Sequence, residues 1–258
     1  MVRPVNAEPA FLIGLRTLPE RLTSNDYPFN LSLVRHLDIA FQSAVTFFVG
    51  ENGTGKSTVI EGVAQLCRLP VSGGSRNELG AGHGPDATSA LAAALRPTFR
   101  QRPRDGYFLR AEFQAHFASL LDARRADPDF DGDPYQLYGG RSLHTRSHGE
   151  AFLAILQHRI RSGMFLFDEP ESALSPQRQL VLLAHMWNMV SEGGSQFVVA
   201  THSPILLTFP GAQILSFDGD TISPVRLEET SHYQITRGIL QNPDAYWRHL
   251  RVPAEHSD

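Results

Sequence analysis

The stretch Gly50-Glu51-Asn52-Gly53-Thr54-Gly55-Lys56-Ser57 fits the phosphate-binding loop pattern G-x-x-x-x-G-K-[ST] at every fixed position. An apolar, β-rich segment at 44–49 precedes the loop, and apolar residues at helical spacing follow it over 57–69. The motif requires this context of strand, loop and helix. The sequence therefore predicts a nucleotide site, in which loop N–H groups and a helix N-terminus bind phosphate oxygens.

Two side chains of the loop have distinct expected roles. Lys56 is expected to neutralise the outer phosphates, and the Ser57 hydroxyl is expected to hold Mg²⁺. Of the 23 Lys and Arg residues, only Lys56 is lysine, which argues against a chance match because a compact ammonium fits between phosphates where a planar guanidinium does not. The residues predicted to contact ATP here are Gly50, Glu51, Asn52, Gly53, Thr54, Gly55, Lys56, Ser57 and Thr58.

Length and composition are those of a globular protein. The 258 residues, 41% hydrophobic and 19% charged, suffice for one large α/β domain, so 1–258 is predicted to be a single domain. No apolar run approaches the roughly 18 residues of a membrane span, and the N-terminus lacks a signal pattern, so we expect a cytoplasmic protein without a transmembrane segment. The net charge of −4 means that nucleic acid would have to bind a local patch.

The N-terminal part is predicted to form an antiparallel edge beside the nucleotide strand. Segments 11–15 and 31–41 have strand character, and Pro, Asn and Asp within 25–28 favour a turn between them. Tyr27 could stack on an adenine ring, although a tyrosine that only flanks a turn is the favoured interpretation. The single cysteine, Cys67, is expected in the core.

An insertion of about 71–145 is predicted to form a helical lobe. Four arginines follow its first helix, at 88–95, and could meet nucleic-acid phosphates, although a solvated charged loop is favoured; they are Arg96, Arg100, Arg102 and Arg104. Asp residues at alternate positions in 127–133 resemble the start of a calcium loop, but Tyr138 occupies the place of the required Glu. We therefore expect an acidic, solvent-facing loop.

Two apolar strands in the second half end in chemically active side chains. Segment 163–169 ends in Asp168 and Glu169, typical of a buried parallel strand that reaches a site with its carboxyl end. We expect Asp168 to hold Mg²⁺ and Glu169 to polarise the attacking water. Segment 196–202 ends in His202, which is expected to touch the γ-phosphate if this strand lies beside the Asp168 strand.

Two further helix starts are recognisable. Ser175-Pro176 predicts the N-terminus of a helix that extends to about residue 190. Arg146-Ser147-His148-Gly149-Glu150 precedes the apolar helix 151–160, and this pattern is compatible with an ordinary N-cap or with an anion site.

Five motifs, in this order and spacing, resemble Walker A, signature, Walker B, D-loop and switch-histidine motifs of ABC-type ATPases: 50–57, 147–150, 166–170, 172–175 and 200–203. The RecF and chromosome-maintenance branch is most similar, particularly its small stand-alone AAA-family ATPases. The resemblance implies a P-loop NTPase with a mostly parallel sheet flanked by helices, an N-terminal antiparallel β subdomain and a helical insertion carrying the signature. It also implies an ATP- and Mg²⁺-dependent ATPase that forms a head-to-tail homodimer, with Ser147 and Gly149 on the partner's γ-phosphate.

The sequence departs from that pattern at His148, where such families usually have Gly, and at Ser175, where Asp is usual. Glu112 or Gln114 would occupy the glutamine-loop position. The segment between the phosphate loop and the signature contains no heptad run, so the sequence excludes a long coiled coil there.

We expect a soluble ATPase whose dimer closure acts on a protein or nucleic-acid partner. The alternatives are the nucleotide-binding subunit of a membrane transporter and a P-loop kinase. A polar and aromatic helical tail is predicted at 228–258, and it could contact a partner or pack on the core.

Overall fold

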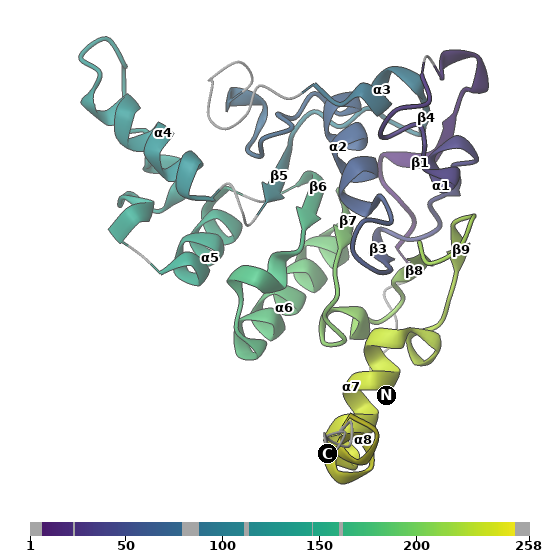
Figure 1. Cartoon of the computed structure of the whole chain (residues 1–258). Coiled ribbons are helices and arrows are strands. Elements are labelled where there is room, and N and C mark those ends of the chain that lie inside the picture. The colour runs from purple at the N-terminus through teal and green to yellow at the C-terminus, as the bar shows by residue number, and fades with distance from the viewer. Residues whose placement is uncertain are drawn as a thin grey trace, which may run out of the picture.

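The computed structural model describes residues 7–22, 24–78, 88–110, 114–145, 147–159 and 162–250 (Figure 1). The strands in these residues are β1 (Leu12–Thr17), β2 (Asp38–Ala40), β3 (Val45–Val49), β4 (Leu95–Phe99), β5 (Gly106–Arg110), β6 (Gly163–Asp168), β7 (Ser195–Ala200), β8 (Gln213–Ser216) and β9 (Ser223–Pro224). The α-helices are α1 (Ser32–Arg35), α2 (Lys56–Leu66), α3 (Ala90–Ala94), α4 (Gln114–Ala126), α5 (His148–Arg159), α6 (Pro176–Glu192), α7 (Ser231–Gln241) and α8 (Pro243–Leu250).

The central sheet has the strand order β5-β6-β7-β3-β8-β9 and is parallel except for β9. This confirms the predicted mostly parallel sheet. In the register, Ala200 of β7 pairs with Phe48 of β3 on one side and with Asp168 of β6 on the other. The carboxyl ends of three neighbouring strands therefore meet at one edge, where ligands bind in open α/β sheets.

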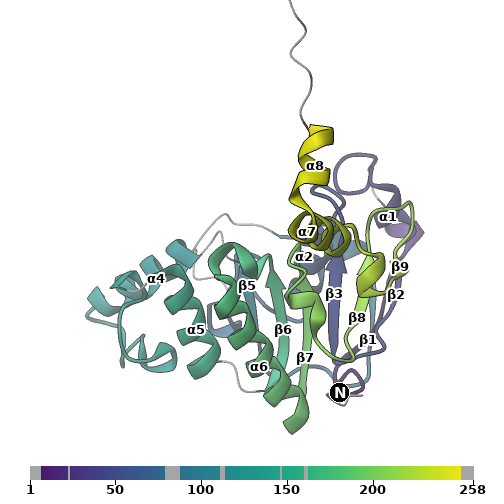
Figure 2. The ribbon, with the colours of Figure 1, turned by 90° about the horizontal axis from the view of Figure 1, so that it is seen from below.

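Both faces of the central sheet are covered. Phe47, Phe165 and Phe197 pack with α4, α5 and α6 on one face. Phe48 and Val198 point to the opposite face, where α2, α3 and the second sheet form another apolar cluster. Figure 2 shows α5 and α6 on one side of the strands and α2 on the other. Burial on both faces explains why these strands have nearly continuous apolar sequences.

The second sheet is antiparallel, with the order β2-β1-β4. It covers one face of the central sheet instead of extending its edge, so the expected edge position is wrong. Within the predicted strand 31–41, residues 32–35 form α1 and only 38–40 pair as β2. Leu33 and Val34 of α1 are buried against the α2 side. A short apolar run fits either a helix or a strand, so tertiary packing decides between them.

A buried polar residue joins the two sheets. Gln196 of β7 has 0% exposure, and its side-chain oxygen accepts hydrogen bonds from the N–H groups of Phe11 and Leu12, both at 2.9 Å. Its amide nitrogen donates to the Leu12 carbonyl at 2.8 Å. Each polar atom is satisfied, so the side chain aligns the N-terminal segment on the central sheet without an unpaired buried group.

The arginine cluster, the acidic loop and Cys67 differ in their exposure to solvent. Arg96 lies on β4, which the sequence did not predict, and Arg100 pairs with Glu8 at 2.8 Å. The side chains of 127–133 face solvent, as expected of the acidic loop, and Cys67 is buried as expected. Burial raises the pKa of the Cys67 thiol to about 12.

The C-terminal helices α7 and α8 extend from the body of the molecule (Figures 1 and 2). Four large apolar side chains on them are exposed: Ile235, Leu240, Trp247 and Leu250. Among the residues that the structure describes, no helix combines the length and apolar character needed to cross a membrane.

Candidate nucleotide site

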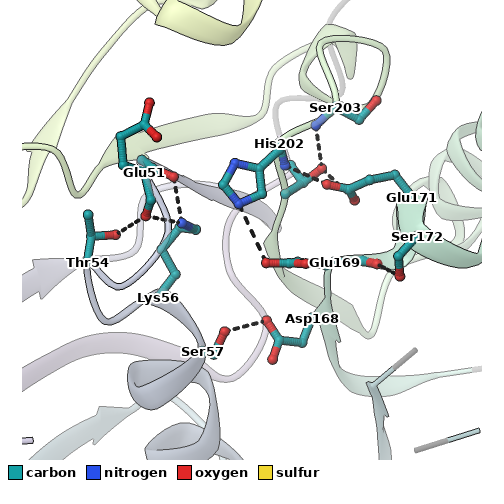
Figure 3. Close-up of polar contacts among 12 residues, drawn as sticks. Glu51, Thr54, Lys56, Ser57, Asp168, Glu169, Glu171, Ser172, His202 and Ser203 are labelled. Carbon is teal, nitrogen blue, oxygen red and sulfur yellow. Dashed lines mark hydrogen bonds and ion pairs between the residues drawn. The ribbon is translucent and has the colours of Figure 1, made fainter. Parts of the chain in front are cut away.

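The glycine-rich loop lies between β3 and α2, as the motif predicts. Gly50, Gly53 and Gly55 all have positive φ, at 143°, 83° and 97°. Lys56 Nζ donates to the carbonyl oxygens of Gly50 at 2.6 Å and Glu51 at 2.8 Å (Figure 3). Only 4% of Lys56 is exposed, and burial lowers the pKa of its amine. The loop therefore holds a buried cation at the N-terminus of α2, as phosphate sites require.

Asp218, which the sequence analysis missed, anchors the start of this loop. Its Oδ1 accepts a hydrogen bond from the Glu51 N–H at 2.7 Å. A Cβ at Gly50 would lie 2.9 Å from the same oxygen and 3.1 Å from Phe217 Cβ, so Gly50 is required for close approach as well as for its φ. Asp218 follows β8, and only the pairing of β8 with β3 brings it here.

The predicted metal ligands are adjacent. Ser57 Oγ donates to Asp168 Oδ1 at 2.9 Å, and Arg110 Nε lies 3.7 Å from Asp168 Oδ2. Burial raises the pKa of Asp168 to about 6, although Arg110 and the Ser57 hydrogen bond oppose the shift. A hydroxyl and a carboxylate are oxygen donors that fit Mg²⁺, which takes few protein ligands and completes its shell with water and phosphate.

We expect Asp168→Asn to stabilise the nucleotide-free protein at neutral pH. The folded carboxyl, with a pKa near 6 against an ordinary 3.8, binds its proton more tightly than the unfolded one, so the free energy of unfolding falls as pH rises from about 4 to 6. The penalty above pH 6 is roughly 3 kcal/mol. Asparagine carries no charge, so the variant does not have this penalty. Urea unfolding at pH 4 and pH 8 measures this; a wild type as stable as the variant at pH 8 would contradict it.

Glu169 follows directly, with backbone angles φ 48° and ψ 55°. This left-handed conformation is uncommon for a residue with a side chain and occurs at functional sites. The Glu169 carbonyl is held by the Ser172 hydroxyl at 2.8 Å, and the Glu169 N–H donates to Ala200 O at 3.0 Å. Glu169 Oε1 lies 3.5 Å from His202 Nε2 (Figure 3). The structure thus brings together the predicted Glu169 and His202.

Glu171 positions the end of β7 and was not found from the sequence. Its Oε1 accepts from the His202 N–H at 2.5 Å, and its Oε2 accepts from Thr201 Oγ1 at 2.8 Å. Burial raises the pKa of Glu171, and these hydrogen bonds oppose the shift. The carboxylate therefore fixes the backbone from which His202 projects.

The predicted signature residues lie at the start of α5. Ser147 and Glu150 form a reciprocal capping box: the Ser147 N–H donates to Glu150 Oε2 at 2.8 Å, and the Glu150 N–H donates to Ser147 Oγ at 3.3 Å. A Cβ at Gly149 would lie 2.9 Å from Ala173 O and would overlap Arg178. Figures 1 and 2 show α5 separated from α2 by strands of the central sheet, so these residues are not beside the phosphate loop of their own chain.

The remaining predicted positions are Tyr27, the two candidates for the glutamine-loop position, and Ser175. The Tyr27 hydroxyl hydrogen-bonds Thr58 Oγ1, and Tyr27 is 65% exposed beside the loop helix. Glu112, one candidate for the glutamine-loop position, lies outside the described residues; Gln114, the other, begins α4. Ser175 is the N-cap of α6 and accepts from the Arg178 N–H at 3.4 Å, which confirms the predicted helix start.

The fold is similar to that of ATP-binding cassette domains of known structure. Residues 151–208 match the family model described as "AAA domain, putative AbiEii toxin, Type IV TA system". A comparison with curated protein sequences finds no match.

Solved structures with a similar fold include an ATP-binding cassette of an ABC transporter in its ADP conformation, with 13% identity and a TM-score of 0.50, covering 94% of this chain and 99% of that one. CbiO1 from Clostridium perfringens, part of the ABC transporter complex CbiONQ, has 14% identity and a TM-score of 0.46, covering 93% and 100%.

Proposed function

We propose that this chain binds ATP with Mg²⁺ and hydrolyses it to ADP and phosphate. The observation that carries the proposal is the convergence of five side chains at adjacent strand ends: Lys56, Ser57, Asp168, Glu169 and His202. They supply a cation for phosphate, two oxygen ligands for a metal, a carboxylate beside the reacting position and a nitrogen donor. This is the set that phosphoryl transfer to water requires.

Each residue has a separate task in this reaction. Lys56 binds the outer phosphates, and Ser57 and Asp168 would hold Mg²⁺, which would supply positive charge to the phosphate oxygens. Glu169 accepts a proton from the attacking water while the oxygen of that water forms a bond to the terminal phosphorus. The bond from that phosphorus to the β-phosphate bridging oxygen breaks, and its electron pair leaves with ADP. His202 Nε2, which lies 3.5 Å from Glu169 Oε1, donates to the terminal phosphate.

We further propose that catalysis needs a second copy of the chain. Helix α5, whose N-terminus carries Ser147 and Gly149, is separated from α2 by strands of the central sheet, so we assign these two residues to a nucleotide held by a partner in a head-to-tail dimer. The absence of a side chain at Gly149 lets the α5 N-terminus pack against the loop that follows Glu169, since a Cβ there would lie 2.9 Å from Ala173 O. The positive end of the α5 dipole at this helix N-terminus is suited to phosphate.

The substitution Ser147→Asp distinguishes between two roles of Ser147, as a helix cap and as a phosphate contact. Aspartate caps a helix as well as serine does, so α5 should keep its stability. Its negative charge would face the partner's γ-phosphate, so we expect hydrolysis and ATP-dependent dimerisation to fall by about ten-fold or more, since a like charge there costs at least about 1.4 kcal/mol.

The measurements are the steady-state ATPase rate, light scattering with ATP, and fluorescent ATP binding to the monomer, which should be unchanged. The matched control is Ser147→Thr, which retains both the cap and the hydroxyl. A Ser147→Asp protein with wild-type turnover would limit Ser147 to capping.

We place the chain in the RecF and chromosome-maintenance-like branch, as a stand-alone ATPase whose dimer closure acts on a protein or nucleic-acid partner. A pull-down with ATP-locked protein tests this. The alternative is a transporter subunit, which the fold likeness to a transporter cassette keeps open. Co-purification with a membrane-spanning protein would favour it, and transfer of the labelled γ-phosphate to a small acceptor would instead indicate a P-loop kinase.

A further inference from the structure

The C-terminal extension reaches the nucleotide site through the side chain of His232. His232, in the first turn of α7, lies with its Nε2 at 2.9 Å from Nδ1 of His202, and the two ring centroids are 5.0 Å apart. The start of α7 is fixed by Thr230, whose buried hydroxyl accepts from the Tyr233 N–H at 3.3 Å and donates to Leu227 O at 2.8 Å. The contact therefore comes from an anchored helix end.

The surroundings determine which nitrogens carry hydrogens. His202 Nε2 faces the Glu169 carboxylate at 3.5 Å, and this negative charge favours the tautomer of His202 that carries its hydrogen on Nε2. The Nδ1 atom of neutral His202 is then an acceptor, so His232 Nε2 must be the donor. Burial lowers the pKa of His202, and the charge of Lys56 lowers it further, which agrees with the neutral form.

The far side of His232 agrees with the same arrangement. Its Nδ1 is buried and has no hydrogen-bond partner among the described residues. In the tautomer with hydrogen on Nε2, this atom is a bare acceptor, whereas the opposite tautomer would bury an unsatisfied donor, which is costly. The two rings therefore donate in one direction, from His232 to His202 and from His202 toward Glu169.

We propose that His232 is a positioning residue that holds His202 with its Nε2 hydrogen directed at the terminal phosphate. The hydrogen bond at one imidazole nitrogen sets both the tautomer and the orientation of the other. The C-terminal extension thereby completes the site of its own chain. This inference rests on the proposed ATP hydrolysis, in which His202 contacts the γ-phosphate.

The first test compares His232→Phe with His232→Gln. Phenylalanine keeps a ring against His202 but removes the donor, so kcat should fall about ten-fold to a hundred-fold while KM for ATP changes less than about two-fold, because partners that orient a histidine have effects of this size. Glutamine places an amide donor near the same position and should recover most of the activity.

The matched control is Ile235→Ala, which lies on the same helix with its side chain 56% exposed and should leave kcat unchanged. Wild-type kcat in His232→Phe, or equal losses in the Phe and Gln variants, would overturn the positioning role. Thermal unfolding of each variant identifies a loss of rate that is due to misfolding.

A second measurement does not depend on hydrolysis. Nitrogen NMR of the imidazole rings in the nucleotide-free wild type, assigned with His202→Gln, should show His202 with its hydrogen on Nε2 and a hydrogen-bonded Nδ1. A hydrogen on Nδ1 of His202 would overturn the inference at any ATPase rate. A protein without ATPase activity but with the expected spectrum would refute the proposed reaction and retain the orientation of the two rings.

Discussion

Glu169→Gln is expected to bind ATP and lose its hydrolysis by a factor on the order of 10² to 10⁴, the usual effect of removing a positioned base. The amide keeps the side-chain volume but cannot accept the proton of the attacking water. Because cleavage is what reopens the proposed dimer, the variant should accumulate as a dimer with Mg²⁺ and ATP. Single-turnover hydrolysis and size-exclusion chromatography with light scattering measure the two effects.

Two comparisons make this result specific. Glu192→Gln makes the same chemical change at an exposed position at the C-terminal end of α6, and it should leave turnover unchanged. Asp168→Asn should remain mainly monomeric with ATP, since it weakens the metal contact and not the base. If Glu169→Gln cleaves ATP at the wild-type rate, the base is elsewhere, and His202 is the next residue to test.

Lys56→Ala is expected to weaken ATP binding by about ten-fold to a hundred-fold and to abolish dimer closure. The ammonium makes charge-assisted hydrogen bonds, which contribute roughly 1.5–3 kcal/mol each. Lys56→Arg should fail similarly, because the planar guanidinium is too wide for the space above the Gly50 and Glu51 carbonyls that Lys56 occupies at 2.6 and 2.8 Å. Titration with fluorescent ATP measures the loss.

A chemical readout uses the fact that Lys56 is the only lysine. An amine-directed reagent should modify position 56 and the N-terminus alone, slowly at Lys56 because it is buried, and ATP should protect it further. Mass spectrometry of the digested protein locates the label. Equal modification of Lys56 with and without ATP would exclude the loop as the phosphate site.

Local sequence predicted those parts of the molecule whose chemistry lies within a few neighbouring residues. The spacing of Gly50, Gly53 and Gly55 before Lys56 specifies a loop that only glycine conformations can form. The apolar run before Asp168 likewise predicts a buried parallel strand, and the structure places it in the sheet beside β7. The predicted central architecture and the proximity of Ser57 to Asp168 follow from these short motifs.

Tertiary structure decided the contacts that join distant segments. Asp218 lies 167 residues from Glu51, Gln196 lies 184 residues from Leu12, and His232 lies 30 residues from His202. The sequence around a polar side chain contains no period or spacing that identifies its hydrogen-bond partner. Strand order and helix docking must bring the two residues together before the contact can form.

Dependence on neighbours that are distant in sequence also explains two errors of the sequence-based prediction: the strand expected at 31–41 and the strand missed at 95–99. The sequence by itself determined that this chain has a phosphate loop with a carboxylate-tipped parallel strand. Only the packed structure decided that residues 32–35 form a helix, that β4 joins a separate sheet, and that Glu171, Asp218 and His232 support the site. Short apolar runs satisfy their backbone hydrogen bonds equally well in a helix or a strand, so the choice depends on which neighbours can bury them.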